Sequence, residues 1–217
     1  MGAWDRGLFE WINHWPDDWN PFLKFFSVAL NQGWVKVAFG LMLLGMILRS
    51  ERTRKTVLLA LIAIGIANTM TNVVKEAFPT NRPFNDQARY ALLKDDGYVL
   101  VQTETGTRST VPKDFNGVFL RVGESKSKGT ASAHSANMAA LAFAMCYFLG
   151  YWGLPWVGVA LLTGVSRIYT GAHYPSQVLL GWLAGVFAAF VVIKTWEAWT
   201  RSRNVVQSDE DDRTELA

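Results

Sequence analysis

The chain has 217 residues, half of them hydrophobic, with ten Trp and a formal net charge of +3. This length suits one sizeable domain, and so modest a charge gives a nucleic-acid-binding protein no support. The single cysteine, Cys146, excludes an intrachain disulfide.

Residues 3–15 are predicted to form an amphipathic helix. One face of this helix gathers apolar residues, namely Trp4, Leu8, Trp11, Ile12 and Trp15. The pattern is typical of a helix that lies in the membrane interface. Pro16 ends it and Pro21 opens the next helix, which is expected to run to about residue 48 with a bend near residues 31–33.

Long apolar segments indicate membrane-spanning helices. Residues 56–74 contain no charged side chain over 19 positions, close to the ~20 apolar residues that a spanning helix needs. Spanning helices are expected over residues 20–48, 56–77, 135–151, 155–169 and 175–199. The fold class is therefore predicted to be all-α, a polytopic membrane helical bundle of about five spanning helices plus the N-terminal interfacial helix.

A polar insertion, residues 78–130, separates the second predicted span from the third. Within it, residues 97–103 and 117–122 have a β-like composition and predict a small β-hairpin or cap. One integral-membrane domain is expected over residues 1–205, with 78–130 as an extramembrane loop. The acidic residues 206–217 are predicted to be a disordered tail.

Basic residues predict the orientation in the membrane. Residues 49–55 hold four basic side chains and one acid, and Lys194, Arg201 and Arg203 follow the last span. The positive-inside rule places both groups in the cytoplasm, and long loops such as 78–130 count for less in that rule. The protein is expected in a bacterial inner membrane, with its C-terminus in the cytoplasm. The opposite ends of the spanning helices are expected to face the periplasm or exterior.

Cations and histidines stand at those outward ends. Lys75 ends one predicted span, His134 begins the next, Arg167 ends the one after, and His173 precedes the last. Ionisable groups kept at a membrane boundary are functional candidates. Cations and hydroxyls around one point neutralise a phosphoryl group, whose transfer depends mainly on positioning and electrostatics. Two histidines then divide the chemistry, one attacking phosphorus and the other protonating the leaving oxygen.

Simpler explanations exist for some of these residues taken singly. Lys75 or Arg167 alone also fits an interface anchor, and His14 fits an interfacial residue without a chemical role. Gly181 and Gly185 form a G-x-x-x-G pair, which predicts close helix packing. No carboxylate–histidine cluster points to a metal site, so neither a metal nor another cofactor is expected.

The motifs resemble the three signatures of the type 2 phosphatidic acid phosphatase superfamily, K-x6-R-P, P-S-G-H and S-R-x5-H-x3-D. Lys75 with Arg82-Pro83 matches the first signature fully. The second stands here as Ala131-Ser132-Ala133-His134, which keeps the Ser and the His. Ser166-Arg167 followed by His173 matches the body of the third. The resemblance covers about residues 56–190.

The resemblance implies a role for each matched residue. His173 is expected to be the nucleophile and His134 the general acid. The residues implied to bind the phosphate are Lys75, Arg82, Ser132, Ala133 and Arg167. Gln177 stands where the family usually has Asp; its carbonyl is expected to accept the Nδ1 hydrogen bond of His173, with less stabilisation of an imidazolium than a carboxylate gives.

The activity implied by the resemblance is that of a membrane phosphatase, which hydrolyses a lipid phosphate or diphosphate through a phosphohistidine and without a metal. Undecaprenyl diphosphate is the first expected substrate, because residues 134–137 and the Ala-rich helix after them resemble bacterial members that act on it. Phosphatidic acid and phosphatidylglycerophosphate come next. Two alternatives stay open: a phosphotransferase that uses a polyprenyl diphosphate donor, and a non-catalytic binder or transporter of lipid phosphates. The oligomeric state is also left open.

Overall fold

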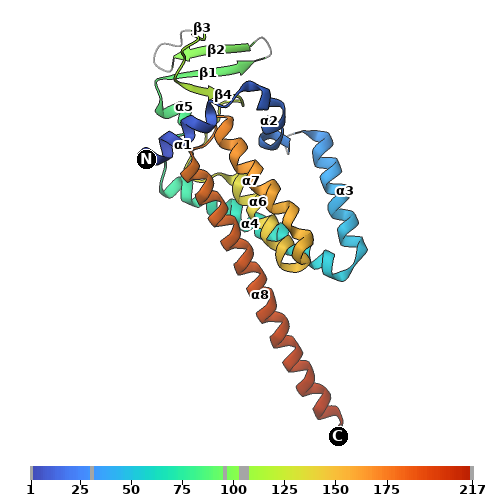
Figure 1. The fold of residues 1–217 in the computed structure, drawn as a ribbon. Helices are drawn as coiled ribbons and strands as arrows, with labels where there is room; N and C mark the ends of the chain where they lie inside the picture. The colour runs from blue at the N-terminus through green and yellow to red at the C-terminus, as the bar shows by residue number, and fades with distance from the viewer. Residues whose placement is uncertain (1, 30–31, 95–96, 103–107, 216–217) are drawn as a thin grey trace.

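A computed structural model of the chain describes residues 2–29, 32–94, 97–102 and 108–215. Three described helical segments are long and apolar enough to cross a membrane: Glu51–Ala77, Ala133–Tyr169 and Pro175–Asn204. A pair bent by 57°, Asp17–Val28 with Gly33–Arg49, counts as a fourth. Within Ala133–Tyr169, the helices Ala133–Leu149 and Leu154–Tyr169 pack against each other on either side of a 3-10 turn (Figure 1). The protein is thus a polytopic helical bundle, as the sequence predicted.

The N-terminal helices are α1 (Ala3–Asn13), a 3-10 turn η1 (Asp17–Trp19), α2 (Asn20–Val28) and α3 (Gly33–Arg49). The bend predicted near residues 31–33 separates α2 from α3, and residues 30–31 lie outside the described part. On α1, Trp4 and Trp11 are exposed as an interfacial helix requires, but Asp5 and Asn13 are buried. The sequence placed these two polar residues away from the apolar face, and hydrogen bonds to the rest of the molecule explain why they are buried.

The bundle itself consists of α4 (Glu51–Ala77), α6 (Ala133–Leu149), the 3-10 turn η3 (Gly150–Gly153), α7 (Leu154–Tyr169) and α8 (Pro175–Glu215). The predicted G-x-x-x-G packing is confirmed between α8 and α6. A Cβ at Gly181 would lie 2.4 Å from Ser132 O, and one at Gly185 would lie 2.1 Å from Ala136 O. Only glycine leaves room for this approach, which brings the start of α8 to the start of α6.

The helix α8 extends well beyond the bundle (Figure 1). It is helical through Glu215, so residues 206–215 form a helix where the sequence predicted a disordered tail. No Gly or Pro interrupts these residues, which removes the strongest local reason for the helix to stop.

A four-stranded sheet covers one end of the bundle, next to the short helix α5 (Pro83–Asp86) (Figure 1). Its strands are β1 (Arg89–Lys94), β2 (Gly97–Gln102), β3 (Arg108–Thr110) and β4 (Val118–Leu120), in the order β3-β2-β1-β4. The sequence predicted the regions of β2 and β4 but neither β1 nor β3. The observed strand pairing therefore differs from the predicted hairpin. β2 pairs antiparallel with β1, and β4 pairs parallel with β1.

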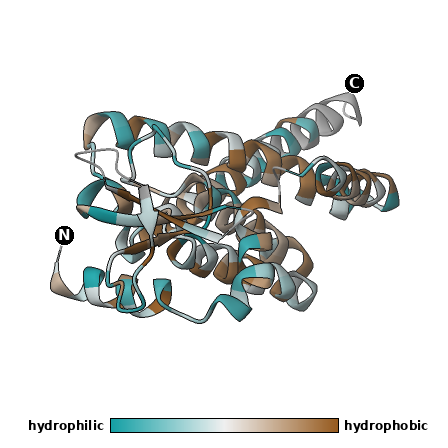
Figure 2. Cartoon of the chain, turned by 90° about the horizontal axis from the view of Figure 1, so that it is seen from above, coloured by the Kyte–Doolittle hydropathy of each residue, from teal (hydrophilic) through white to brown (hydrophobic). Residues whose placement is uncertain are grey.

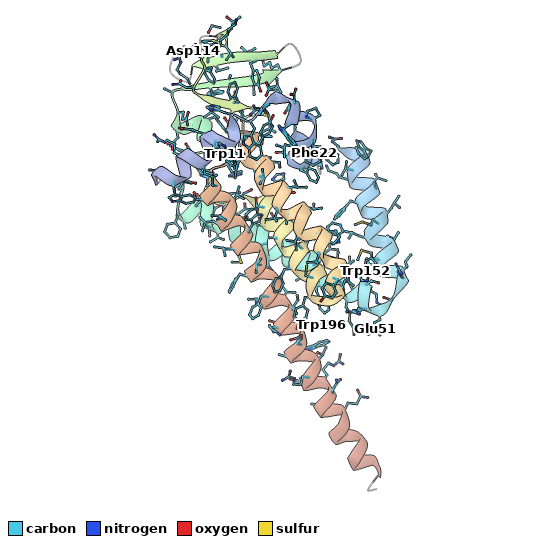
Figure 3. The ribbon with its side chains drawn as sticks, viewed as in Figure 1. Trp11, Phe22, Glu51, Asp114, Trp152 and Trp196 are labelled. Carbon is cyan, nitrogen blue, oxygen red and sulfur yellow. The ribbon has the colours of Figure 1, made fainter. Side chains whose placement is uncertain are left out.

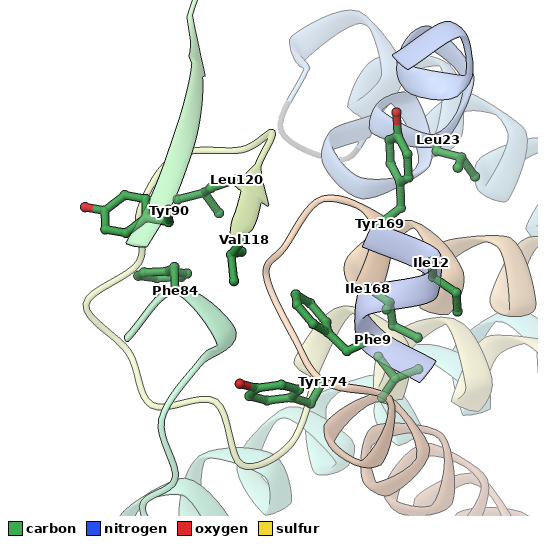
Figure 4. Close-up of a cluster of buried hydrophobic side chains, with 11 residues drawn as sticks. Phe9, Ile12, Leu23, Phe84, Tyr90, Val118, Leu120, Ile168, Tyr169 and Tyr174 are labelled. Atoms are coloured by element: carbon green, nitrogen blue, oxygen red, sulfur yellow. The ribbon is translucent and has the colours of Figure 1, made fainter. Parts of the chain in front are cut away.

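A cluster of buried apolar side chains joins this sheet to the bundle (Figure 4). It consists of Phe9, Ile12, Leu23, Phe84, Tyr90, Val118, Leu120, Ile168, Tyr169, Tyr174 and Val178. These residues come from α1, α2, α5, the sheet and both sides of the turn between α7 and α8. The cluster therefore fixes the sheet and α1 against that turn, which carries His173.

The outer surface of the bundle suits lipid. Hydrophobic residues run along the helices (Figure 2), and Leu41 and Leu183 are 64% and 67% exposed. Exposed aromatic residues lie at both ends: Trp11 and Phe22 near the sheet, and Trp152 at the other end (Figure 3). Aromatic side chains at two levels are typical of a protein that spans a bilayer.

Candidate active site

The turn between α7 and α8 holds His173 in a fixed orientation. The side chain is 2% exposed, and its Nδ1 lies 3.1 Å from Gln177 Oε1 and 3.1 Å from Gly129 O. A backbone carbonyl only accepts, so Nδ1 carries the ring proton. The other nitrogen, Nε2, carries the ring lone pair and accepts a hydrogen bond from Arg82 Nη1 at 3.2 Å.

Gln177 is itself oriented by its neighbours. Its Nε2 donates to Asn81 O at 2.8 Å and to Thr80 Oγ1 at 3.2 Å, which turns Oε1 toward His173. A Cβ at position 129 would lie 2.7 Å from the Gln177 amide nitrogen and 3.0 Å from Asn81 O, so any larger residue there would displace the Gln177 amide. The structure thus places a carbonyl oxygen where the family usually has an Asp carboxylate.

Arg82, which follows α4, is 5% exposed and reaches toward His173. Its Nε donates to Ser127 O at 2.8 Å, and its Nη2 donates to Ser127 Oγ at 2.7 Å. Its Nη1 donates to Ala172 O at 3.0 Å. Burial lowers the pKa of Arg82 from its usual value, although a guanidinium remains charged at neutral pH.

Arg167, near the end of α7, is 8% exposed. Its Nη1 donates to Ser27 Oγ at 2.7 Å and to Ser27 O at 3.2 Å. Its Nε is buried and has no hydrogen-bond partner among the described residues. The sequence did not identify Ser27, because a single serine in the apolar segment of α2 carries no local signal of this contact.

Lys75, in the last turn of α4, completes a cluster of three cations with Arg82 and Arg167. The ion pairs among the described residues are Lys55–Glu51, Arg121–Asp17 and Lys194–Glu197, and none of them includes a member of this cluster. The positive charges of Lys75, Arg82 and Arg167 act electrostatically on both histidines, His134 and His173. Buried charge without an opposite charge is costly, so the cluster favours an anionic ligand.

Burial and these positive charges together keep His173 neutral. Burial is the main cause that lowers the pKa of His173 well below 6.5, and the positive charges of Arg167, Arg82 and Lys75 lower it further. The hydrogen bond with Gln177 acts in the opposite direction but does not outweigh them. At neutral pH the imidazole is therefore unprotonated at Nε2, as a nucleophile must be.

The start of α6 contributes the remaining predicted residues. Ser132 is fully buried and caps α6, with its Oγ accepting from Ser135 N at 3.4 Å and from Ser135 Oγ at 2.9 Å. Its backbone N–H donates to Gln177 O at 2.9 Å, which ties this helix start to that of α8. Ala133 is the first helical residue, and no described non-glycine residue has a positive φ, so alanine fits here without strain. His134 follows it and is half-buried.

His134 also lines an apolar cavity of about 310 Å³. The aromatic walls of this cavity are Phe25, Phe26, Phe39 and Trp156, from α2, α3 and α7. Asn137, one turn along α6 from His134, lines it as well, and its Oδ1 is buried without a partner among the described residues. The sequence did not predict this cavity, because its walls come from helices that are distant along the chain.

Comparisons with known proteins agree with the motifs. Residues 56–201 match the family model of the PAP2 superfamily, which is more than half of the chain. The chain belongs to the PAP2 superfamily. This confirms the resemblance that the three motifs indicated, and with it the assignment as an enzyme of the PAP2 type. Within the described part of this PAP2 protein, no three His, Cys, Asp or Glu side chains come together as a metal site requires.

Two solved structures share the fold. The crystal structure of Aquifex aeolicus LpxE matches with a TM-score of 0.58 and 21% identity, over 89% of this chain and 96% of that chain. The crystal structure of the first transmembrane PAP2 type phosphatidylglycerolphosphate phosphatase, from Bacillus subtilis, matches with a TM-score of 0.57 and 18% identity, over 91% and 89% of the two chains. Together with the spanning helices, they identify this PAP2 protein as an integral membrane protein.

A curated relative is similar over a shorter stretch. The bacitracin transport permease protein BcrC of Bacillus licheniformis is 36% identical over 64 residues. These residues are 30% of this chain and 32% of that protein, so the similarity spans about a third of the relative.

Proposed function

We propose that this protein is a membrane lipid phosphatase that passes a phosphoryl group from a lipid to His173 and then to water. One observation carries the proposal: three cations without an acidic partner among the described residues act on a buried, neutral histidine, and Arg82 Nη1 lies 3.2 Å from its Nε2. A dianionic phosphate would supply the missing negative charge and would place phosphorus in front of Nε2.

In the proposed reaction, Lys75, Arg82 and Arg167 bind the phosphate oxygens. Ser132 Oγ accepts both bonds from Ser135, so its own proton is free to be donated to the phosphate. Next to it, the backbone N–H groups of Ala133 and its neighbours at the start of α6 form the positive end of a helix dipole, which favours an anion.

His173 Nε2 then attacks phosphorus, and the bond between phosphorus and the lipid oxygen breaks. The negative charge of the bound phosphate offsets the three cations, so His134 is protonated in the complex and donates its proton to that oxygen. Water next attacks the phosphohistidine, His134 takes up the proton, and inorganic phosphate leaves. Throughout, Gln177 Oε1 accepts the Nδ1 hydrogen bond and partly stabilises the positive ring.

The apolar cavity beside His134 supports a lipid as the leaving group. A chain in this cavity would place its ester oxygen next to the proposed general acid. Undecaprenyl diphosphate is the first proposed substrate, on the likeness of residues 134–137 to bacterial members that act on it. Phosphatidic acid and phosphatidylglycerophosphate follow, and the structural similarity to the Bacillus subtilis phosphatidylglycerolphosphate phosphatase supports the latter.

The proposed orientation places the site at the periplasmic or exterior face of the bacterial inner membrane. The sheet lies at the end of the bundle that carries the site, whereas the junction of α3 and α4, with the basic residues 49–55, lies at the other end (Figure 1). The positive-inside rule places that basic junction and the C-terminus in the cytoplasm. Residues 1–205 form one phosphatase domain in this proposal, with 78–130 as its extramembrane loop insertion.

The test is phosphate release by purified protein in detergent, from a panel of lipid phosphates with EDTA present. The wild type is expected to release phosphate, and His173→Ala is expected to abolish release. His14→Ala is the matched control, because His14 is the exposed third histidine and contacts Gly117 O instead of the site. Unchanged release by His173→Ala would sink the proposal.

The same assay separates the two alternatives. A phosphotransferase would release little phosphate until an acceptor lipid is added. A non-catalytic binder would show no turnover as wild type and would keep its affinity for the lipid after His173→Ala.

A further inference from the structure

Asp5 of α1 is a buried carboxylate that faces the first turn of α8. It is 1% exposed; its Oδ1 accepts from Ser176 N at 2.8 Å, and its Oδ2 accepts from Ser176 Oγ at 2.7 Å. No ion pair among the described residues includes it. A buried carboxylate is costly unless its surroundings compensate, and here the two hydrogen bonds and the positive end of the α8 dipole do so.

The start of α8 needs this carboxylate because it has no short capping side chain of its own. Pro175 is the first helical residue, so Tyr174 stands at the N-cap position, where Ser, Thr, Asp or Asn is favoured. Gln177, the third helical residue, supplies one half of a capping box, since its Oε1 accepts from Tyr174 N at 3.2 Å. Asp5 acts as a cap from a different helix by accepting the N–H of Ser176, the second helical residue.

This capped turn also sets the orientation of the proposed nucleophile. The Oε1 atom that closes the capping box is the atom that lies 3.1 Å from His173 Nδ1. We propose that Asp5 is a positioning residue for phosphoryl transfer, which caps α8 in trans and thereby holds Gln177 against His173. The inference rests on the proposed function and adds to it a residue outside all three motifs.

Other contacts hold α1 in place independently of Asp5. Asn13 Nδ2 donates to Tyr169 O at 2.9 Å, and the ring of Phe9 lies 5.0 Å from that of Tyr174 (Figure 4). The helix therefore lies across the His173 turn and is attached on both sides of it. Removal of the Asp5 carboxylate is expected to loosen the start of α8 while α1 stays docked.

The kinetic test compares three variants on the lipid phosphate that the wild type hydrolyses best. Asp5→Ala is expected to lower kcat on the order of 10- to 100-fold with less than about a twofold change in KM, because orientation is lost and binding is kept. Asp5→Asn keeps an oxygen for the N–H of Ser176 and is expected to recover most of kcat. Glu10→Ala removes the same charge from the exposed side of α1 and should leave kcat unchanged. Wild-type kcat in Asp5→Ala overturns the inference.

A second readout does not depend on turnover. Protein labelled with ¹⁵N in histidine is expected to report the Nδ1–H tautomer for His173 in the wild type and in Glu10→Ala, and mixed tautomers in Asp5→Ala. An unchanged tautomer in folded Asp5→Ala overturns the inference whether or not a lipid is hydrolysed. If the tautomer changes but the wild type hydrolyses no lipid phosphate, only the proposed function fails. Should Asp5→Ala not fold, Asp5→Leu replaces it, because leucine fills the volume of the carboxylate without an acceptor for the N–H of Ser176. An unchanged tautomer and kcat in Asp5→Leu overturn the inference equally.

Discussion

The two histidines of the site lie in contrasting surroundings. His173 is almost fully buried, and both of its ring nitrogens are held by protein atoms. His134 is half-buried at the start of α6 and borders an apolar cavity in which Asn137 Oδ1 has no partner among the described residues. The first half of the site is organised by the protein alone, whereas the second leaves space for a ligand.

The contrast matches what each proposed step requires. A nucleophile must present one lone pair in one direction before the substrate arrives, which demands rigid partners on the other nitrogen. A general acid must reach an oxygen that belongs to the substrate, and its hydrogen bond forms only in the complex. The predictions below change one half of the site at a time.

The largest effect on catalysis is expected for His134, which borders the apolar cavity. His134→Ala should lower kcat for a lipid phosphate by about 10²- to 10⁴-fold, the usual contribution of general acid catalysis. With an aryl phosphate whose leaving group needs no proton, the release of the aryl alcohol in the first turnover should be nearly as fast as in the wild type. Rapid-quench measurements on both substrates check this, and equal losses on both would contradict the role of His134.

A smaller effect on catalysis is expected for Gln177, which holds His173. Gln177→Ala removes the acceptor of the Nδ1 hydrogen bond while Gly129 O remains, so kcat should fall by about 10- to 100-fold. Steady-state kinetics on the lipid and on the aryl phosphate should show the same factor, because the nucleophile serves both. A loss confined to the lipid would place Gln177 in lipid binding instead.

Filling the apolar cavity beside His134 should weaken binding of the lipid chain and leave the phosphoryl-transfer step unchanged. Val159→Phe adds volume inside the cavity, and overpacking costs about 1–3 kcal/mol, so KM for a long-chain lipid phosphate should rise about tenfold. KM for a short aryl phosphate should stay the same. Val157→Phe is the matched control, because Val157 lies on the same helix and lines a different groove.

The smallest effect is the response to mild acid. The pKa of His173 lies well below 6.5, so its reactive neutral form persists as the pH falls from 7.5 to 6.5. After correction for ionisation of the substrate phosphate, kcat/KM should change less than about twofold over this range. A fall by half near pH 6.5 would mean that His173 titrates like an unperturbed histidine.

Much of the fold could be predicted from local sequence. The uncharged residues 56–74 predict a span by length alone, and Gly181 with Gly185 predicts close packing at the right position. The pairing of β1 with β4 is a contact between distant segments, and nothing local specifies it. The acidic composition of residues 206–215 predicts disorder, but no Gly or Pro interrupts them and they continue the helix α8.

The candidate site divides in the same way. Its motif residues could be predicted because Lys75, Arg82, Arg167 and both histidines stand at the spacings of the three family signatures. Ser27 and Asp5 were missed, since each becomes important only through a partner about 140 or 170 positions away in the chain. Sequence motifs predict the residues that are proposed to act on a substrate, and tertiary packing determines which residues hold them.

The central claim is that His173 attacks phosphorus through Nε2, because Nδ1 is occupied by Gln177 Oε1 and Gly129 O. The most direct measurement uses His134→Ala with an aryl phosphate, where the phosphoenzyme should form without an acid and then persist without a base. Rapid quenching, proteolysis and phosphohistidine analysis of the peptide that contains His173 should find phosphate on Nε2. Turnover with no phosphate on His173, or with phosphate on Nδ1, would contradict the account.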